Sequence, residues 1–317
     1  LHSGSVTRQS LIIDCDPGVD VAVGLLLAFC SPEMDLLAVT SVAGNVSIER
    51  TTRNARILRQ LAGRTEVPVF AGAQRPLRRP PGEAAEFHGV EGLGVLETFE
   101  PDLPVAEGTA PQAIIEAVMA RPEGAVALAV MGPMTNLALA LRAEPRLAGR
   151  LGPVVVMGGA RSEGGNITAS AEFNIWADPD AAAEVFASGC RVTVLGLDVT
   201  HQVRATQARI AAIETLPGVC ARTAASLLRF SQDGERRIVG WEWAPLHDPC
   251  TVAWLLKPEL FRAVPCRIDV ETESDLTRGH TAVEFRVDAA SARHHWVVEA
   301  DADAVFALIA ERLERLP

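Results

Sequence analysis

The stretch that decides the fold joins a buried strand to an apolar helix, and it reads Leu11-Ile12-Ile13-Asp14-Cys15-Asp16-Pro17-Gly18-Val19-Asp20-Val21-Ala22-Val23-Gly24-Leu25-Leu26-Leu27. Three carboxylates fall within it, at Asp14, Asp16 and Asp20. A strand that ends in acids and turns through Pro-Gly into a helix is typical of open α/β sheets, which bind ligands at the carboxyl ends of their strands. The stretch therefore predicts an active site beside the first strand.

Strand-like and helical patterns alternate along most of the chain. We expect strands at 11–14, 36–42, 67–71, 125–131, 153–157 and 191–197, and helices at 20–30, 48–61, 111–120, 135–141, 179–187 and 250–256. The alternation favours parallel strands with helical crossovers, and the continuous apolar runs favour a sheet that is covered on both faces. The predicted fold class is α/β, with one large domain over 10–317 after a flexible segment or expression remnant at 1–9.

The last third of the chain changes character. Residues alternate between apolar and polar over 267–270, 280–287 and 296–299, and an amphipathic helix is predicted over 303–316. These half-exposed strands predict a small antiparallel edge near the C-terminus of an otherwise parallel sheet.

Two long stretches show no regular pattern. One is 74–94, which is rich in Arg, Pro and Gly, and the other is 231–245, which carries Trp241 and Trp243. Because long loops in compact domains often cover binding sites, we expect both stretches to act as lids.

Composition limits the classes of partner. The chain has 29 basic and 40 acidic residues and a net charge of -11, which argues against a nucleic acid or an anionic membrane as partner. Its apolar runs are too short to span a bilayer, and its six cysteines lack CxxC spacing, so we predict a cytoplasmic protein with buried thiols. The chain has no tyrosine, which excludes any mechanism that needs one.

The acidic cluster favours a hard cation. Carboxylates this close repel one another unless a cation neutralises them, and oxygen ligands suit calcium or magnesium. A purely structural interpretation makes Asp20 an N-cap and Asp14 a hydrogen-bonded strand end, but it leaves Asp16 without a role.

Three later segments bring further polar groups to strand ends. Residues 131–136 turn from a strand into a helix, and residues 163–174 offer amides and carboxylates that suit a ligand with several hydroxyls. His247 stands beside Asp248 at a helix start, where a histidine can act as a general acid. Each segment alone is also compatible with an ordinary turn, loop or structural histidine.

Together these segments resemble the nucleoside hydrolases of the inosine-uridine-preferring type. The motifs that carry the resemblance are Asp14-Cys15-Asp16-Pro17-Gly18-Val19-Asp20, Val42-Ala43-Gly44-Asn45, His88-Gly89, Met157-Gly158-Gly159, Ala171-Glu172-Phe173-Asn174, Gly196-Leu197-Asp198-Val199-Thr200-His201 and His247-Asp248-Pro249. The resemblance runs from about Leu11 to the C-terminus and implies a nucleoside-hydrolase-like catalytic domain with a Rossmann-like open sheet.

The resemblance implies calcium-dependent hydrolysis of the N-glycosidic bond of a ribonucleoside, which gives ribose and a free base. By position, the metal ligands would be Asp16, Asp248 and the carbonyl of Met131, supported by Asp14. Asp16 would also take the proton of the water that attacks C1′. His247 would protonate or polarise the leaving base.

Six residues would hold the substrate by the same resemblance: Asp20, Asn45, His88, Asn166, Glu172 and Asn174. Carboxylates among them would stabilise the positive charge of the ribosyl oxocarbenium ion. His247 immediately before the metal-binding aspartate suggests pyrimidine preference or broad specificity. The partner would be a small ribonucleoside in nucleoside catabolism and salvage, and the relatives suggest a homodimer or homotetramer.

One position departs from the family pattern. Relatives usually carry a calcium-binding aspartate directly after the one that matches Asp20, and here that position is Val21. We expect weaker calcium binding, because affinity follows the charge and number of the ligands. The chain is either a hydrolase with one substitution or a homologue with altered chemistry, although Val21 could also merely pack the helix.

Two other functions remain open on the sequence. A ribonucleoside-binding protein without catalysis could retain Asn166, Glu172 and Asn174 while its metal site is damaged. A phosphatase of the haloacid dehalogenase type also begins with a strand-end Asp-x-Asp, but the single lysine, Lys257, is poorly placed for its phosphate site.

Overall fold

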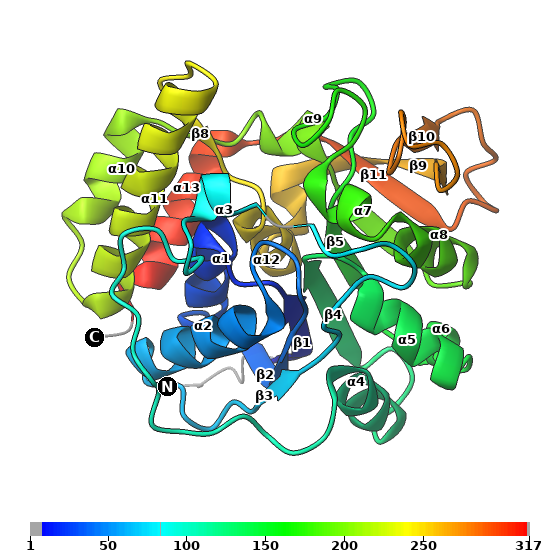
Figure 1. Cartoon of the computed structure of the whole chain (residues 1–317), viewed down its shortest axis with the longest axis horizontal. Helices are drawn as coiled ribbons and strands as arrows, with labels where there is room; N and C mark the ends of the chain where they lie inside the picture. Colours follow the sequence, from blue (N-terminus) through cyan, green and yellow to red (C-terminus); the bar gives the residue numbers. More distant parts are fainter. Residues whose placement is uncertain (1–7, 83, 316–317) are drawn as a thin grey trace, which may run out of the picture.

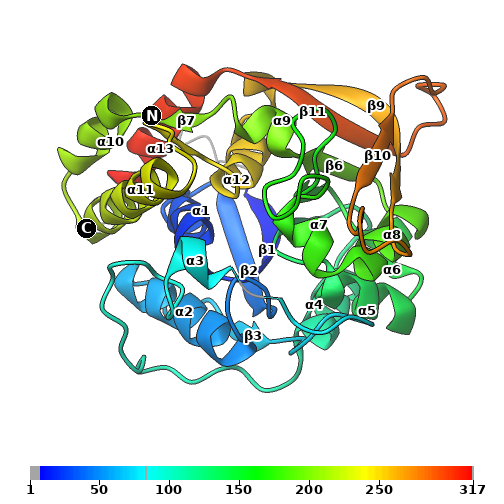
Figure 2. The same ribbon diagram turned by 45° about the horizontal axis from the view of Figure 1, so that its top comes forward.

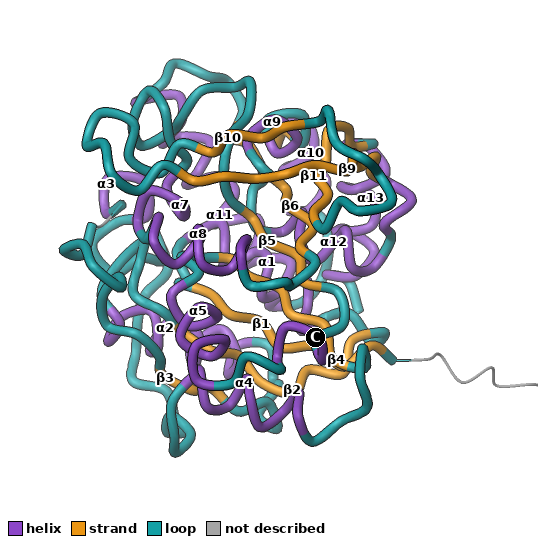
Figure 3. Tube along the Cα trace, turned by 90° about the vertical axis from the view of Figure 1, so that its right-hand side faces the viewer, coloured by secondary structure: helices purple, strands orange, loops and turns teal. Residues whose placement is uncertain are grey.

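The fold is built on one nine-stranded sheet, which we describe from a computed structural model over residues 8–82 and 84–315. In spatial order its strands are β10 (Thr281–Glu284), β9 (Phe261–Val270), β11 (His294–Ala300), β6 (Val192–Leu195), β5 (Val154–Met157), β4 (Val126–Met131), β1 (Gln9–Cys15), β2 (Met34–Ser41) and β3 (Val69–Ala71). A two-stranded ribbon joins β7 (Arg204–Ala205) to β8 (Ala244–Pro245). Figure 3 shows the strands crossing the molecule between the helices.

Helices connect the strands and cover the sheet. They are α1 (Val19–Phe29), α2 (Ile48–Leu61), α3 (Ala85–His88), α4 (Ala110–Met119), α5 (Thr135–Ala143), α6 (Leu147–Arg150), α7 (Phe173–Ala177), α8 (Pro179–Ala187), α9 (Leu197–Thr200), α10 (Gln207–Glu214), α11 (Val219–Ile238), α12 (Pro249–Leu256), the 3₁₀ helix η1 (Pro258–Leu260) and α13 (Ala302–Leu313). No helix in the described ranges is long and apolar enough to cross a membrane.

The two faces of the sheet bury separate cores. Leu11 and Ile13 of β1 face a cluster that includes α1, α11, α12 and α13, whereas Ile12 faces a cluster with α4, α5 and α8. In Figure 1, α10, α11 and α13 gather at one side and α4, α5 and α6 at the other. The parallel strands are therefore buried on both faces, as their continuous apolar sequences predict.

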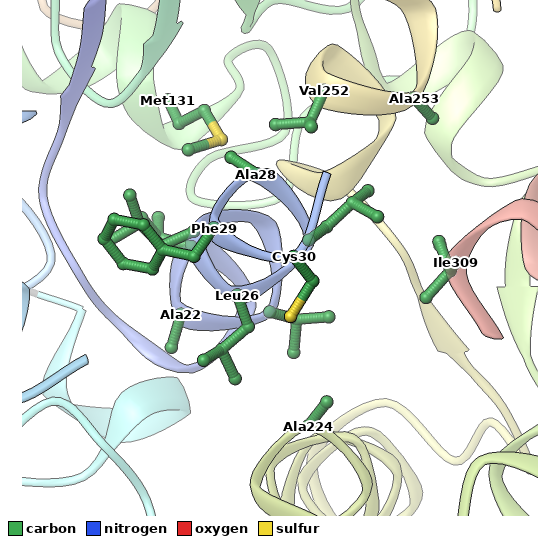
Figure 4. Close-up of a cluster of buried hydrophobic side chains, with 14 of the residues drawn as sticks. Ala22, Leu26, Ala28, Phe29, Cys30, Met131, Ala224, Val252, Ala253 and Ile309 are labelled. Atoms are coloured by element: carbon green, nitrogen blue, oxygen red, sulfur yellow. The ribbon is translucent and has the colours of Figure 1, made fainter. Parts of the chain in front are cut away.

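Helix α1 lies at the centre of the first core. All its residues are buried, and it packs against α2, α11, α12, α13 and β2. Figure 4 shows this helix end-on, with Met131, Ala224, Val252 and Ile309 around it. A helix that is apolar on all sides must be enclosed by protein, which explains why the acidic stretch ends in such a hydrophobic run.

The sheet reverses its strand order at β1. The chain runs from β1 outward through β2 to β3 and then returns to place β4 on the other side of β1. Such a reversal opens a crevice at the carboxyl ends of the strands, where α/β sheets bind ligands. The ends of β1 and β4 bring Asp16 and Met131 to this crevice, where the nitrogen of Asp16 lies 3.4 Å from the carbonyl oxygen of Met131.

The predicted antiparallel edge is confirmed. β9 pairs antiparallel with both β10 and β11, and β11 joins the parallel part of the sheet through β6. The predicted parallel strands and their helices are also found, with boundaries that differ by at most two residues. Figure 2 shows β9, β10 and β11 on the side of the molecule away from α2.

The predicted irregular stretch at 231–245 is wrong in its first half. Residues 231–238 form the last turns of α11, whose polar face is held by an ion pair from Arg236 to Glu242 and a hydrogen bond from Gln232 to the Glu242 carbonyl. Helices α10 and α11 were not expected, because polar residues interrupt their apolar positions. In the structure α11 packs on α1, and α10 packs on α11 and α13.

The chain termini also differ from expectation. Strand β1 already begins at Gln9, so the predicted leading segment 1–9 is at least one residue too long, and residues 1–7 lie outside the described residues. Helix α13 ends at Leu313, earlier than the predicted 316, which itself lies outside the described residues.

Candidate active site

A cavity of about 410 Å³ opens above the strand ends. Its polar lining contains seven of the residues expected to bind substrate or react, namely Asp20, Asn45, His88, Asn166, Glu172, Asn174 and His247, together with Asp248. These residues come from segments as far apart as α1 and the start of α12, so the fold brings the separate motifs to one place.

Asp16 lies under this cavity and is fully buried. Its Oδ2 accepts a hydrogen bond of 2.7 Å from the backbone nitrogen of Asn45, and the side-chain amide of Asn45 donates to the Asp16 carbonyl at 3.0 Å. Side chains at Gly44 and Gly132 would overlap the Asp16 carboxylate, so both glycines are required by its position. The motif after β2 therefore fixes the orientation of Asp16.

Asp14 is held one layer deeper. Its Oδ1 accepts hydrogen bonds from the Thr40 hydroxyl at 2.6 Å and from the Asn136 amide at 2.7 Å. Burial raises the pKa of Asp14 to about 7, although both hydrogen bonds oppose the rise. Asp14 does not line the cavity, which fits the supporting role expected for it, and Asn136 supplies a contact that the sequence did not assign.

Asp20 connects the first motif to the last. Its Oδ2 accepts hydrogen bonds from the backbone nitrogens of His247 at 3.1 Å and Asp248 at 2.5 Å. Burial raises the pKa of Asp20 to about 6 against these hydrogen bonds. One carboxylate thus positions the His-Asp pair while it also lines the cavity.

The two proposed acidic metal ligands have unsatisfied oxygens. Oδ1 of Asp16 and Oδ1 of Asp248 are buried and have no hydrogen-bond partner among the described residues. Burial raises the pKa of both carboxyls well above the usual range. Repulsion from Glu172 and Asp14 adds to the rise at Asp16, and repulsion from Asp20 and Asp16 adds to it at Asp248. Buried acceptors without donors need a cation or protons, so this pair fits one side of a hard cation.

The remainder of a metal centre is incomplete. Within 8–82 and 84–315, no three His, Cys, Asp or Glu side chains are arranged to hold a metal ion. Val21 is fully buried in the α1 core and contributes no oxygen. The donors that remain therefore fit a hard cation with fewer ligands than a tight calcium site provides.

The opposite wall holds Glu172 in a fixed orientation. Its carboxylate accepts hydrogen bonds from the backbone nitrogens of Gly159 at 3.0 Å, Asn174 at 2.8 Å and Ile175 at 3.2 Å. Burial nevertheless raises the pKa of Glu172 to about 7. Because the residue caps α7, the local helix start determines where this carboxylate points.

Two amides flank Glu172. The Asn174 side chain donates to the Met157 carbonyl at 3.1 Å, and the Asn166 side chain accepts from the Phe173 nitrogen at 2.9 Å. Each amide keeps its other polar atom for a ligand, and both residues line the cavity. Together with Glu172 they form a polar wall that suits a polyhydroxyl ligand.

His88 enters the cavity from α3. Its Nδ1 accepts a hydrogen bond of 2.9 Å from the backbone nitrogen of Val19, so a neutral His88 carries its proton on Nε2. Burial lowers the pKa of His88 to about 4, which keeps the ring neutral near pH 7. His88 can therefore donate one hydrogen bond to a ligand.

His247 belongs to a second group of polar residues. Its Nδ1 lies 2.8 Å from the Thr200 hydroxyl, and its ring centre lies 6.0 Å from that of His201. His201 in turn contacts Glu163 at 2.8 Å. Burial lowers the pKa of His247 to about 3.

The far end of the cavity has aromatic and apolar walls. Trp241 lines it, stacks on Trp243 with ring centres 4.3 Å apart, and meets His201 edge-on. Trp243 is covered on its other side by Arg204, so it supports Trp241 and does not itself line the cavity. Glu235 of α11 also lines this end, and the sequence analysis missed it because it was assigned to a loop.

Comparisons with known proteins agree on one family. A match to the inosine-uridine preferring nucleoside hydrolases extends over residues 11–307. The chain is 41% identical over 310 residues to an uncharacterised protein of Schizosaccharomyces pombe, a match that covers 98% of this chain and 100% of that protein. It is 40% identical over 305 residues to the pyrimidine-specific ribonucleoside hydrolase RihA of an Enterobacter species, with 96% and 97% covered.

Solved structures support the same conclusion. The plant nucleoside hydrolase PpNRh1 matches with a TM-score of 0.91 at 30% identity over 97% of this chain and 99% of that one. A purine-preferring ribonucleoside hydrolase from Gardnerella vaginalis matches with a TM-score of 0.90 at 31% identity, over 96% and 98%. The chain is a ribonucleoside hydrolase and belongs to the inosine-uridine preferring nucleoside hydrolase family.

Proposed function

We propose that this chain hydrolyses pyrimidine ribonucleosides with the help of a weakly held calcium ion. The observation that carries the proposal is the pair of unsatisfied buried oxygens on Asp16 and Asp248 beneath a cavity with a polar wall. Relatives at about 40% identity that are named pyrimidine-specific support the choice of base, although a purine-preferring relative is 31% identical.

The polar wall would bind the ribose. Glu172 would accept hydrogen bonds from the sugar hydroxyls, and the Asn174 side chain would form further hydrogen bonds with them. Asn166, Asn45 and Asp20 would complete the ribose site. The carboxylate of Glu172 lies in a buried setting where it stabilises positive charge more strongly than it would in water. This arrangement favours the oxocarbenium ion that forms as the glycosidic bond breaks.

Three groups would carry the reaction. Asp16 would accept the proton of the attacking water, because its Oδ1 has no hydrogen-bond partner in the part of the chain that the structure describes. His247, whose lowered pKa keeps its ring neutral near pH 7, would polarise the leaving base through a hydrogen bond, and Thr200 would fix its ring orientation. A calcium ion bound by Asp16, Asp248 and the Met131 carbonyl would lower the pKa of the attacking water and hold the ribose diol.

The simplest test is a hydrolysis assay. Uridine and cytidine should give ribose and free base at rates that calcium increases and a chelator abolishes. Binding of uridine without any release of uracil, measured by calorimetry and chromatography at saturating calcium, would instead support the non-catalytic nucleoside-binding function.

Restoring the missing carboxylate tests the role of Val21. Val21→Asp should raise calcium affinity by about tenfold or more and raise hydrolysis at low calcium, because a third charged ligand is added. Val21→Asn is the matched control, since it adds polarity without charge. Unchanged calcium binding and unchanged hydrolysis in Val21→Asp would contradict this account of Val21.

Two further predictions concern the whole protein. A cytoplasmic location and a homodimeric or homotetrameric state remain expectations from the family resemblance. Light scattering after size exclusion would measure the assembly directly.

A further inference from the structure

Glu235 is a cavity carboxyl without a partner. It lies near the end of α11 and lines the cavity together with Ser231, Val239 and Trp241. No hydrogen bond or ion pair from another described residue reaches its side chain, and only burial and the charge of Asp20 act on it. Glu235 is half-buried, and a carboxyl with a shifted pKa in a cavity is a candidate for a functional role.

Neighbouring acids are all accounted for. Glu163 contacts His201, while Glu242 and Asp233 both pair with Arg236. Of these carboxyls, Glu242 and Asp233 do not line the cavity. Among these four carboxyls, Glu235 is therefore the one that lines the cavity without a contact to a basic side chain of the described residues, because Glu163, which also lines the cavity, contacts His201.

The position of Glu235 places it near the expected site of the nucleoside base. The groups suited to the sugar gather at the strand ends, on Asp16, Asn45, Glu172 and Asn174. Further walls come from α11 with Trp241, from Ala84 and Phe87, and from Ile167 and Phe173. A nucleoside bound by its ribose would extend its base between these walls, where Glu235 is the carboxyl that α11 contributes. Apolar surroundings there favour a flat base and weaken the charged form of a carboxyl.

We propose that Glu235 is a catalytic residue that donates a proton to the leaving base, an inference that rests on the proposed ribonucleoside hydrolysis. When the C1′–N bond breaks, its electron pair passes to the base, and the Glu235 carboxyl proton transfers to a ring nitrogen or carbonyl oxygen of that base. Water adds to C1′ and loses its proton to Asp16. Exchange with solvent then removes that proton from Asp16 and returns one proton to Glu235.

The acidity of Glu235 suits this step. Burial, with a smaller effect from Asp20, raises the pKa of Glu235 to about 7, so the group is half protonated near neutral pH. The titratable groups that share its cavity are Asp20 on α1, His88 on α3, Glu163 on the loop after β5, Glu172 at the start of α7, His201 after α9, and His247 and Asp248 before α12. An acid with a pKa near the working pH transfers protons most effectively.

The test compares two leaving groups. Glu235→Gln keeps the size of the side chain but removes its proton, so kcat for uridine should fall by about 10²-fold or more. 4-Nitrophenyl riboside leaves without protonation, and its kcat should change by less than about threefold. For uridine, the parent rate should fall as the pH rises through about 7, and this limb should be absent in Glu235→Gln.

Control variants make the result decisive. Asp233→Asn makes the same change on an exposed residue of the same helix and should leave both rates unaltered. Glu235→Asp keeps an acidic proton and should recover part of the uridine rate. Equal losses on both substrates, or no loss on uridine, would overturn the role of Glu235 and leave the proposed function standing. A parent protein that hydrolyses neither substrate would overturn both the proposed function and this inference.

Discussion

The two ends of the cavity are built differently. At the sugar end, Asp16 and Glu172 follow strand ends or cap a helix, and backbone nitrogens hold their carboxylates at 2.7 to 3.2 Å. At the base end, the walls come from the last turns of α11 and from Trp241, which is held by ring stacking. The sugar end is thus fixed by the sheet, whereas the base end depends on one helix terminus and a loop.

This difference suits the sugar end to stabilisation of the transition state and the aromatic wall of the base end to recognition of the base. Charges that must stabilise a transition state need donors and acceptors that are already oriented, and the backbone around the sheet provides them. Stacking surfaces tolerate small shifts, because aromatic contacts depend weakly on exact geometry. Substitutions at the sugar end should therefore reduce turnover on every substrate, whereas substitutions of the stacking surface at the base end should alter binding and the choice of base. Glu235 is the exception at the base end, because its proposed role is proton donation.

The largest effect is expected at Asp16. Asp16→Asn keeps the shape of the side chain but removes the proton acceptor and one metal ligand, so kcat should fall by about 10³-fold or more on every nucleoside. The fold should be retained, since an amide oxygen can still accept the hydrogen bond from Asn45. Steady-state rates and thermal unfolding measure both effects, and a variant with near-parental turnover would remove Asp16 from the reaction.

A second, smaller loss is expected at Glu172. Glu172→Gln removes a negative charge beside the sugar and turns one amide nitrogen toward backbone donors, so kcat should fall by about 10²-fold. The loss should be similar for uridine and 4-nitrophenyl riboside, because the oxocarbenium ion forms with both. A loss confined to uridine would place Glu172 at the base end and contradict the division of the cavity.

The same substitution tests the pH dependence of stability. The pKa of Glu172 is raised to about 7 in the folded chain, from 4.5. Between these values the folded state binds more protons than the unfolded state, so the free energy of unfolding falls as the pH rises. In Glu172→Gln the fall in Tm from about pH 4.5 to 7 should be smaller than in the parent, whereas an identical fall in both proteins would indicate that Glu172 titrates normally.

Much of the sugar end could be predicted from the sequence. Helices such as 48–61 and 179–187 have boundaries identical to the predicted ones, because strong apolar periodicity and Pro or Ser starts mark them. Strand ends in an open α/β sheet converge, so Asp16 and Glu172 could be assigned to one crevice before the structure was known. The hydrogen bond from Asn136 to Asp14 was missed, since it joins residues 122 positions apart.

The base end could not be predicted in the same way. The run from Ser231 to Arg237 contains a glycine and mostly polar residues, a composition typical of loops. Helix α11 nevertheless continues to Ile238. It packs on α1, and its buried Gln232 donates a hydrogen bond to the Glu242 carbonyl, which are tertiary contacts that local propensity does not report. Glu235 therefore became visible as a cavity residue only once the helix was placed.

The smallest effect is expected at the two tryptophans. Trp241→Leu removes the ring that lines the cavity, so KM for uridine should rise about three- to tenfold while kcat changes less, which corresponds to the loss of one aromatic contact. Trp243→Leu is the matched control, because Trp243 stacks on Trp241 and under Arg204 without lining the cavity. A larger KM change in Trp241→Leu than in Trp243→Leu would indicate contact with the base, whereas equal changes would show that both rings act only by supporting the loop.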